Sequence, residues 1–168
     1  LRIGALITKN KEVKRNVMKF CQARLSAPLI GQIAAEASLD ANPDYMLNNY
    51  NEYVNRRKFL IDGLNRIDGV YSPIPMGAFY TVARLPVDNA DKFCSWLLSD
   101  FELENQTLFM APASGFYTEP GKGLDEVRIA YVLKKEDLAV CLKILEEALK
   151  IYPGSKVRQI VANNESVR

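Results

Sequence analysis

Gly-Leu-Asp-Glu-Val-Arg-Ile-Ala-Tyr-Val-Leu, residues 123–133, is an apolar stretch with a single arginine, Arg128, inside it. Val127 and Ile129 alternate with Arg128 and Ala130, which is the two-residue period of a β-strand. Side chains of a strand project alternately to opposite faces, so Arg128 is expected on the face opposite Val127. Two hypotheses follow. Either this is an edge strand whose Arg128 faces water, or it is an interior strand whose poorly solvated guanidinium awaits an anion from a ligand. Its planar fork of N–H groups suits a carboxylate.

The composition narrows the possible classes of protein. The chain has 168 residues and a formal net charge of +2, with one basic triplet at 56–58, so nothing indicates a nucleic-acid partner. No apolar run approaches the length of a membrane span. Three widely spaced cysteines, Cys21, Cys94 and Cys141, suggest buried, reduced thiols and a cytoplasmic location. Histidine is absent, which excludes His-based triads and His-rich zinc sites, and we predict no metal site.

Apolar periodicity and turn residues predict an α/β fold in which helices cover a small mixed or antiparallel sheet. The loop 113–125 is long enough to be functional, and its Gly-Lys-Gly at 121–123 is interpreted as a turn rather than a phosphate loop. Strands are predicted at 3–8, 70–71, 77–84 and 107–110 in addition to the Arg128 strand, and helices at 11–24, 28–39, 44–67, 88–99 and 135–152.

Three pieces of sequence, in this order, resemble the fold-type I pyridoxal-phosphate-dependent aminotransferases of the aspartate aminotransferase-like (class I/II) branch. The first is Arg2-Ile3-Gly4, and the second is Met76-Gly77-Ala78-Phe79-Tyr80 at the entry to a strand. The third runs from Ala111-Pro112 to Phe116 and on to Glu126-Val127-Arg128-Ile129-Ala130, before a leucine-rich helix. The resemblance covers nearly all of this chain but only the C-terminal part of such an enzyme.

The resemblance implies a domain organisation and four site residues. Residues 1–40 would be a remnant of the large cofactor-binding domain, contributing a strand and helices, and 41–68 a long connecting helix. Residues 69–153 would form the C-terminal small domain, and 154–168 a tail. Arg2 would bind the cofactor phosphate, Arg128 the α-carboxylate of the substrate, and Gly77 and Ala78 would approach the substrate.

The resemblance also implies what this chain lacks. The family's cofactor-holding lysine lies a few residues before the phosphate-binding arginine, and only Leu1 precedes Arg2 here. We therefore expect no catalytic residue in this chain, no pyridoxal 5′-phosphate bound to it alone, and no activity without the N-terminal domain. The full-length homodimer would transfer an amino group between an amino acid, with an aspartate-like donor favoured, and a 2-oxo acid. Ala113 stands where the family usually has a glycine after the proline.

Two alternatives remain open. The parent could be another fold-type I pyridoxal-phosphate enzyme, such as a C–S lyase, a decarboxylase or a synthase. It could also be a non-enzymatic α/β regulatory or binding domain, which predicts a permanent carboxylate partner for Arg128 within the chain. The aminotransferase hypothesis predicts instead that helices between Lys11 and Leu39 expose apolar side chains.

Overall fold

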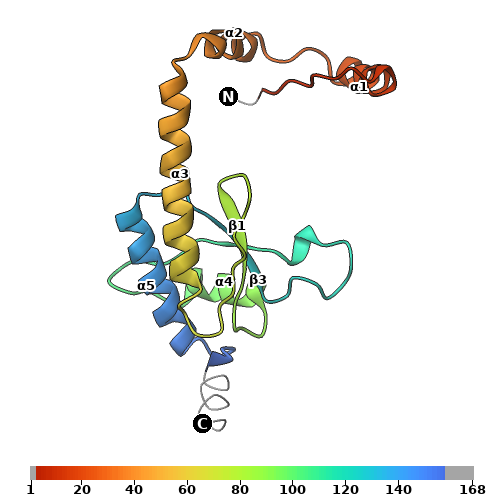
Figure 1. The fold of residues 1–168 in the computed structure, drawn as a ribbon. Coiled ribbons are helices and arrows are strands. Elements are labelled where there is room, and N and C mark those ends of the chain that lie inside the picture. The colour runs from red at the N-terminus through yellow and green to blue at the C-terminus, as the bar shows by residue number, and fades with distance from the viewer. Residues whose placement is uncertain (1–2, 158–168) are drawn as a thin grey trace. The chain divides into compact units, whose positions relative to one another are not determined.

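The computed structural model describes residues 3–157, whose backbone forms the helices and strands of Figure 1. By backbone contacts the chain divides into two compact units, residues 1–48 and 49–168. The long helix α3 (Pro43–Leu64) contains the boundary between them. No helix in the described range is both long and apolar enough to cross a membrane.

The first unit is helical. It contains α1 (Lys11–Arg24), α2 (Leu29–Ala37), the short 3₁₀ helix η1 (Ser38–Asp40) and the start of α3. The Asn10 side chain caps α1 by accepting hydrogen bonds from the backbone N–H groups of Glu12 and Val13 at 2.9 and 3.1 Å. The strand predicted at residues 3–8 is wrong: these residues form no strand, and the described part of this unit contains no strand with which they could pair.

The helices of the first unit expose apolar side chains. No residue of α1 is buried, and in α2 only Gly31 is buried. The prediction of a buried thiol is therefore wrong for Cys21 of α1, which is exposed. Phe20 in α1 and Leu29, Ile30 and Ile33 in α2 are all exposed. The expectation of uncovered apolar residues between Lys11 and Leu39 is therefore confirmed.

The second unit is built on a three-stranded antiparallel sheet of β1 (Tyr80–Arg84), β2 (Ala111–Pro112) and β3 (Glu126–Ala130), in the order β1-β3-β2. In the register of this sheet, Arg128 lies opposite Val82 of β1 and Ala111 of β2. The Arg128 strand is thus the central strand, and the hypothesis that it is an edge strand is wrong.

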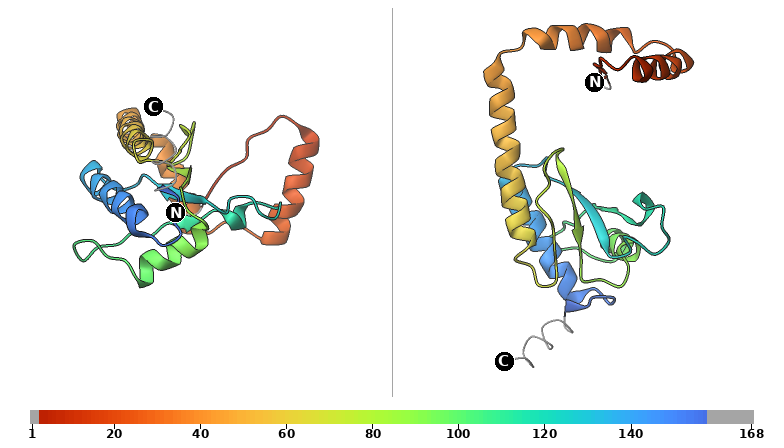
Figure 2. Two further views of the ribbon diagram at one scale, coloured as in Figure 1. Left: turned by 90° about the horizontal axis from the view of Figure 1, so that it is seen from below. Right: turned by 45° about the vertical axis from the view of Figure 1, so that its right-hand side comes forward.

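Helices cover one face of this sheet. These are the C-terminal part of α3, α4 (Ala90–Ser99) and α5 (Lys135–Ile151), and α5 runs alongside α3 (Figures 1 and 2). Leu142 of α5 lies against Gly63 of α3, where no larger side chain would fit without moving it. The core between sheet and helices is apolar and includes Leu60, Leu64, Ala83, Phe93, Leu97, Val127, Leu145 and Leu149. The predicted fold class, a small sheet covered by helices, is confirmed.

Three predicted strands differ in extent. Near residues 70–71 the backbone makes only an isolated bridge, between Tyr71 and Arg84. Residues 107–110 form no strand, because pairing with β3 begins only at Ala111. Strand β1 starts at Tyr80 rather than at Gly77, because Ala78 has a positive φ of 59° that an extended strand does not allow.

Candidate functional site

Arg128 lies in the middle of the sheet, on the face that the described helices leave open. Val127 beside it is fully buried, whereas Arg128 is exposed. The expectation of a poorly solvated guanidinium is therefore wrong for this chain. The physical reason is that α3, α4 and α5 all pack on the Val127 face.

Two aromatic rings flank the Arg128 guanidinium. Its central carbon, Cζ, lies 5.3 Å from the centroid of the Tyr80 ring and 5.1 Å from that of Phe116. Both distances are within the range of a cation–π attraction. Tyr80 belongs to β1 and lies two residues before Val82, which pairs with Arg128. Phe116 is the last residue of the short 3₁₀ helix η2 (Ser114–Phe116).

The loop that carries Phe116 is tied to the sheet and to α4. The Ala113 N–H donates to the Glu126 carbonyl at 2.9 Å, and the Ser114 hydroxyl donates to the Asp91 carboxylate at 2.8 Å. The Tyr117 hydroxyl donates to Glu126 Oε2, and this hydrogen bond raises the pKa of Tyr117. Phe116 is thus held close to Arg128 by bonds to both neighbouring elements.

Gly123 closes the same loop in a conformation that favours glycine. Its φ is +69°, and a Cβ there would lie 2.5 Å from Tyr117 Cε2. Gly121 also has a positive φ, of 86°. These angles confirm that Gly-Lys-Gly at 121–123 is a turn, and the close contact at Gly123 lets the Tyr117 ring pack down onto the loop.

Arg128 makes no ion pair or side-chain hydrogen bond with any residue in the range 3–157. The nearest carboxylate on its own strand, Glu126, accepts from Tyr117 instead. The hypothesis of a non-enzymatic domain predicted a permanent carboxylate partner, and the described chain does not provide one. The N–H groups of the guanidinium therefore remain available for an anion.

Gly77 and Ala78 lie in the turn before β1. The Tyr131 hydroxyl donates to the Ala78 carbonyl at 3.0 Å, and the Tyr131 N–H donates to the Phe79 carbonyl at 2.9 Å. The Phe79 ring meets the Tyr80 ring edge to face, with 5.5 Å between centroids. The turn is therefore connected to Arg128 through Tyr80, and no hydrogen bond described for this chain joins Gly77 or Ala78 to Arg128 directly. The fourth predicted site residue, Arg2, lies outside the described residues.

The sequence analysis did not single out Tyr80 or Phe116 as site residues. Tyr80 could have been found from strand alternation, since it shares a face with Val82 and, across the pair, with Arg128. Phe116 could not, because its approach to Arg128 depends on the course of an irregular loop.

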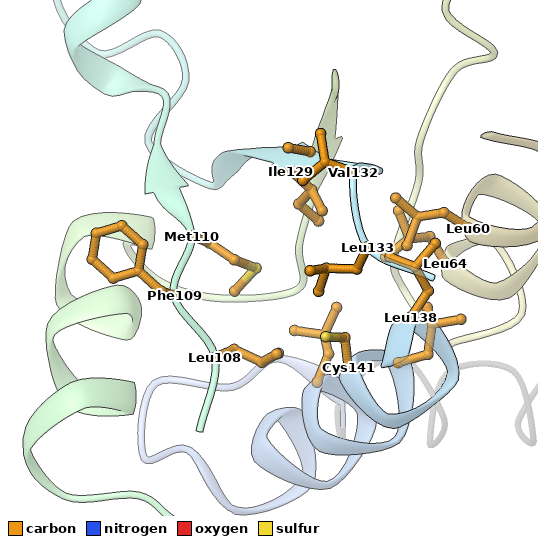
Figure 3. Close-up of a pocket in the computed structure, with 13 residues that line it drawn as sticks. Leu60, Leu64, Leu108, Phe109, Met110, Ile129, Val132, Leu133, Leu138 and Cys141 are labelled. Atoms are coloured by element: carbon orange, nitrogen blue, oxygen red, sulfur yellow. The ribbon is translucent and has the colours of Figure 1, made fainter. Parts of the chain in front are cut away.

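A separate cavity of about 240 Å³ lies on the helix-covered side of the sheet (Figure 3). Ile129, which projects away from Arg128, lines it together with Leu60, Leu138 and Cys141. Its lining carries no charged side chain, and burial raises the pKa of the Cys141 thiol. This cavity does not suit a carboxylate. In the described range, no group of three or more Cys, Asp or Glu side chains could hold a metal ion.

Comparison with known proteins gives a consistent result. No family model matches the sequence. The chain is 27% identical over 161 residues to an aspartate aminotransferase of Rhizobium meliloti, and 28% identical over 162 residues to one of Pyrococcus horikoshii. Each match covers 89% of this chain, and the chain spans 37% of the length of these curated relatives.

Solved structures agree with the sequence matches. Alanine aminotransferase from Pyrococcus furiosus superimposes with a TM-score of 0.65 at 26% identity, over 84% of this chain and 35% of that one. The aspartate aminotransferase from Rhizobium meliloti gives 0.59 at 25% identity, over 79% and 34%. LysN, the α-aminoadipate aminotransferase of Thermus thermophilus, gives 0.66 over 83% and 36%, and at 21% identity it supports the fold alone. The resemblance in the sequence is thereby confirmed: the chain has the fold of the pyridoxal-phosphate-dependent aminotransferases, over part of their length.

Proposed function

We propose that this chain belongs to an aminotransferase in which Arg128 binds the α-carboxylate of the amino-acid substrate. The observation that carries the proposal is an arginine at the centre of an open sheet face, with no carboxylate partner among residues 3–157. An arginine can hold a carboxylate with two parallel charge-assisted hydrogen bonds, which fix its direction as well as its position. Arg128 would thereby orient the substrate Cα, a binding role and not that of an acid or base.

The cofactor of such an enzyme would be pyridoxal 5′-phosphate, which supplies an electron sink when bound. The open face around Arg128 offers a guanidinium and aromatic rings, a set that fits the substrate carboxylate. We propose that Arg2 contributes to the phosphate site, and that Gly77 and Ala78 bring the backbone close to the substrate. The group that holds the cofactor would come from outside this chain.

We further propose that the donor is aspartate-like and the acceptor a 2-oxo acid, since the curated relatives cited above are aspartate aminotransferases. The same proposal includes a homodimer and a preceding cofactor-binding domain. It also includes domain boundaries in this chain after residues 40, 68 and 153. The preceding domain is supported by the match to 37% of the relatives' length. The exposed apolar residues of α1 and α2 also support a covering partner.

Assay of the protein encoded by the whole gene tests this function. Supplied with pyridoxal phosphate, aspartate and 2-oxoglutarate, the wild type should form oxaloacetate and glutamate. Arg128→Ala should lower kcat/KM on the order of a hundredfold, because a bidentate charge-assisted contact is lost. Arg128→Lys should fall between the two, since lysine keeps the charge and loses the fork.

Arg84 provides the matched control. It lies on the same open face at the end of β1, with its Cζ 5.9 Å from the centroid of the Tyr71 ring. Arg84→Ala should change kcat/KM less than about threefold. An Arg128→Ala protein with normal KM for aspartate would refute the assignment of Arg128. Cleavage or decarboxylation of amino acids without transamination would favour the other fold-type I reactions.

The 168-residue chain itself should be inactive. Mixing it with pyridoxal phosphate and then reducing with borohydride should label no single lysine in preference to the others, as peptide mass mapping would show. A stable adduct at one specific lysine would contradict this part of the proposal.

A further inference from the structure

We propose that Phe116, acting with Tyr80, is a positioning residue that holds the Arg128 guanidinium ready for a carboxylate. This inference rests on the function proposed above and assigns to the loop 113–125 a part in that site. It starts from the two cation–π contacts of Arg128, with Cζ 5.1 Å from the Phe116 ring centroid and 5.3 Å from that of Tyr80.

An unpaired arginine on an open face would ordinarily be mobile. Its long side chain has several rotatable bonds, and a ligand must restrict them before two hydrogen bonds can form together. Ring faces attract the cation without accepting its N–H hydrogens in conventional hydrogen bonds. Phe116 and Tyr80 can therefore restrict the side chain while its N–H groups stay available to a carboxylate.

The loop is built to keep Phe116 in this place. The Phe116 N–H donates to the Ala113 carbonyl at 2.9 Å, Ser114 is bonded to Asp91 of α4, and Tyr117 is bonded to Glu126 of β3. Phe116 itself remains 57% exposed, so it adds little to the core that would explain its position. Its ring centroid lies 5.1 Å from Cζ of Arg128.

Substitution of Phe116 in the whole-gene protein tests the inference. Phe116→Leu keeps an apolar side chain but removes the ring face, and it should raise KM for the amino acid about fivefold with kcat nearly unchanged. Phe116→Tyr keeps an aromatic ring and should have the same KM as the wild type. Phe109→Leu, at another exposed phenylalanine that lines the separate apolar cavity, should leave KM unchanged.

A double mutant distinguishes positioning from a general structural effect. In an Arg128→Ala background, Phe116→Leu should cause no further rise in KM, because the cation that it positions is gone. An equal effect in both backgrounds, or a normal KM for the single variant, would overturn the inference. Either of these outcomes would leave the proposed function intact, provided that Arg128→Ala itself lowers kcat/KM.

A readout without activity completes the test. In the ¹⁵N-labelled 168-residue chain, the Arg128 Nε–Hε resonance is identified by its loss in Arg128→Lys. Phe116→Leu should shift this resonance, because the nearby ring current is removed, and Phe109→Leu should not. An unshifted Arg128 resonance would overturn the positioning role even if the whole-gene protein proved to have no aminotransferase activity.

Discussion

Val127 and Arg128 are neighbours in β3, and their side chains lie on opposite faces of the sheet. Val127 is fully buried beneath the helices, while Arg128 is exposed on the open face. Val127→Ala should therefore lower the free energy of unfolding by about 2 kcal/mol, because it removes buried methyl groups. Arg128→Ala should change it by less than about 0.5 kcal/mol, as for other exposed positions. Urea denaturation of the two variants measures the contrast. Equal losses would mean that the faces of β3 are wrongly assigned.

The turn at Gly123 should tolerate no side chain. Gly123→Ala places a Cβ at φ +69° and against the Tyr117 ring, so we expect a loss of more than about 1 kcal/mol in the free energy of unfolding. Gly121→Ala is the matched control, since its φ is also positive but a Cβ there meets nothing within 4 Å. Thermal unfolding should rank wild type above Gly121→Ala and Gly121→Ala above Gly123→Ala. The reverse order of the two variants would contradict the packing of Tyr117 on the loop.

Ala78 carries backbone strain that glycine would relieve. Its φ of 59° is costly for a residue with a Cβ, on the order of 1 kcal/mol, and costs glycine little. Ala78→Gly should therefore raise the free energy of unfolding or leave it unchanged. Ala83→Gly, in the buried part of β1, should lower it by about 1 kcal/mol. Chemical denaturation of both variants tests this, and a marked loss at Ala78→Gly would argue against the strained turn.

Tyr152 should make stability depend on alkaline pH. Burial, and then its hydrogen bond to Asp88, raises the pKa of Tyr152 to about 12. An unfolded tyrosine has a pKa near 10, so the folded state holds this proton more tightly. The stability gained in this way is complete below pH 10 and is lost as the pH rises from about 10 to about 12.

The measurement is the free energy of unfolding between pH 9 and pH 12 for wild type and Tyr152→Phe. The variant should show a shallower decline over this interval, because it has no hydroxyl to titrate. Tyr50→Phe, at an exposed tyrosine, serves as the control for the substitution itself. Identical slopes in wild type and Tyr152→Phe would refute the raised pKa.

Local sequence patterns determined the positions of most helices and the face of β3 on which Arg128 lies. The helix predicted at 11–24 has the same bounds as α1, and those predicted at 28–39, 88–99 and 135–152 match α2, α4 and α5 within two residues at each end. The placement of Arg128 opposite Val127 followed from strand alternation alone. These properties depend on residues close together in the chain, which is why the sequence suffices for them.

Only the tertiary structure determined which face of the sheet is open and that Phe116 lies beside Arg128 on that face. Residues 3–8 and 107–110 have strand-like sequences but pair with no strand in the described chain, and β3 is central because β1 and β2 pair with its two edges. Phe116 reaches Arg128 only because its loop is bonded to Glu126 of β3 and to Asp91 of α4, which lies 23 residues before Ser114 in the sequence. Pairing and packing between such distant segments depend on the whole arrangement of the chain, so no local pattern of residues specifies them.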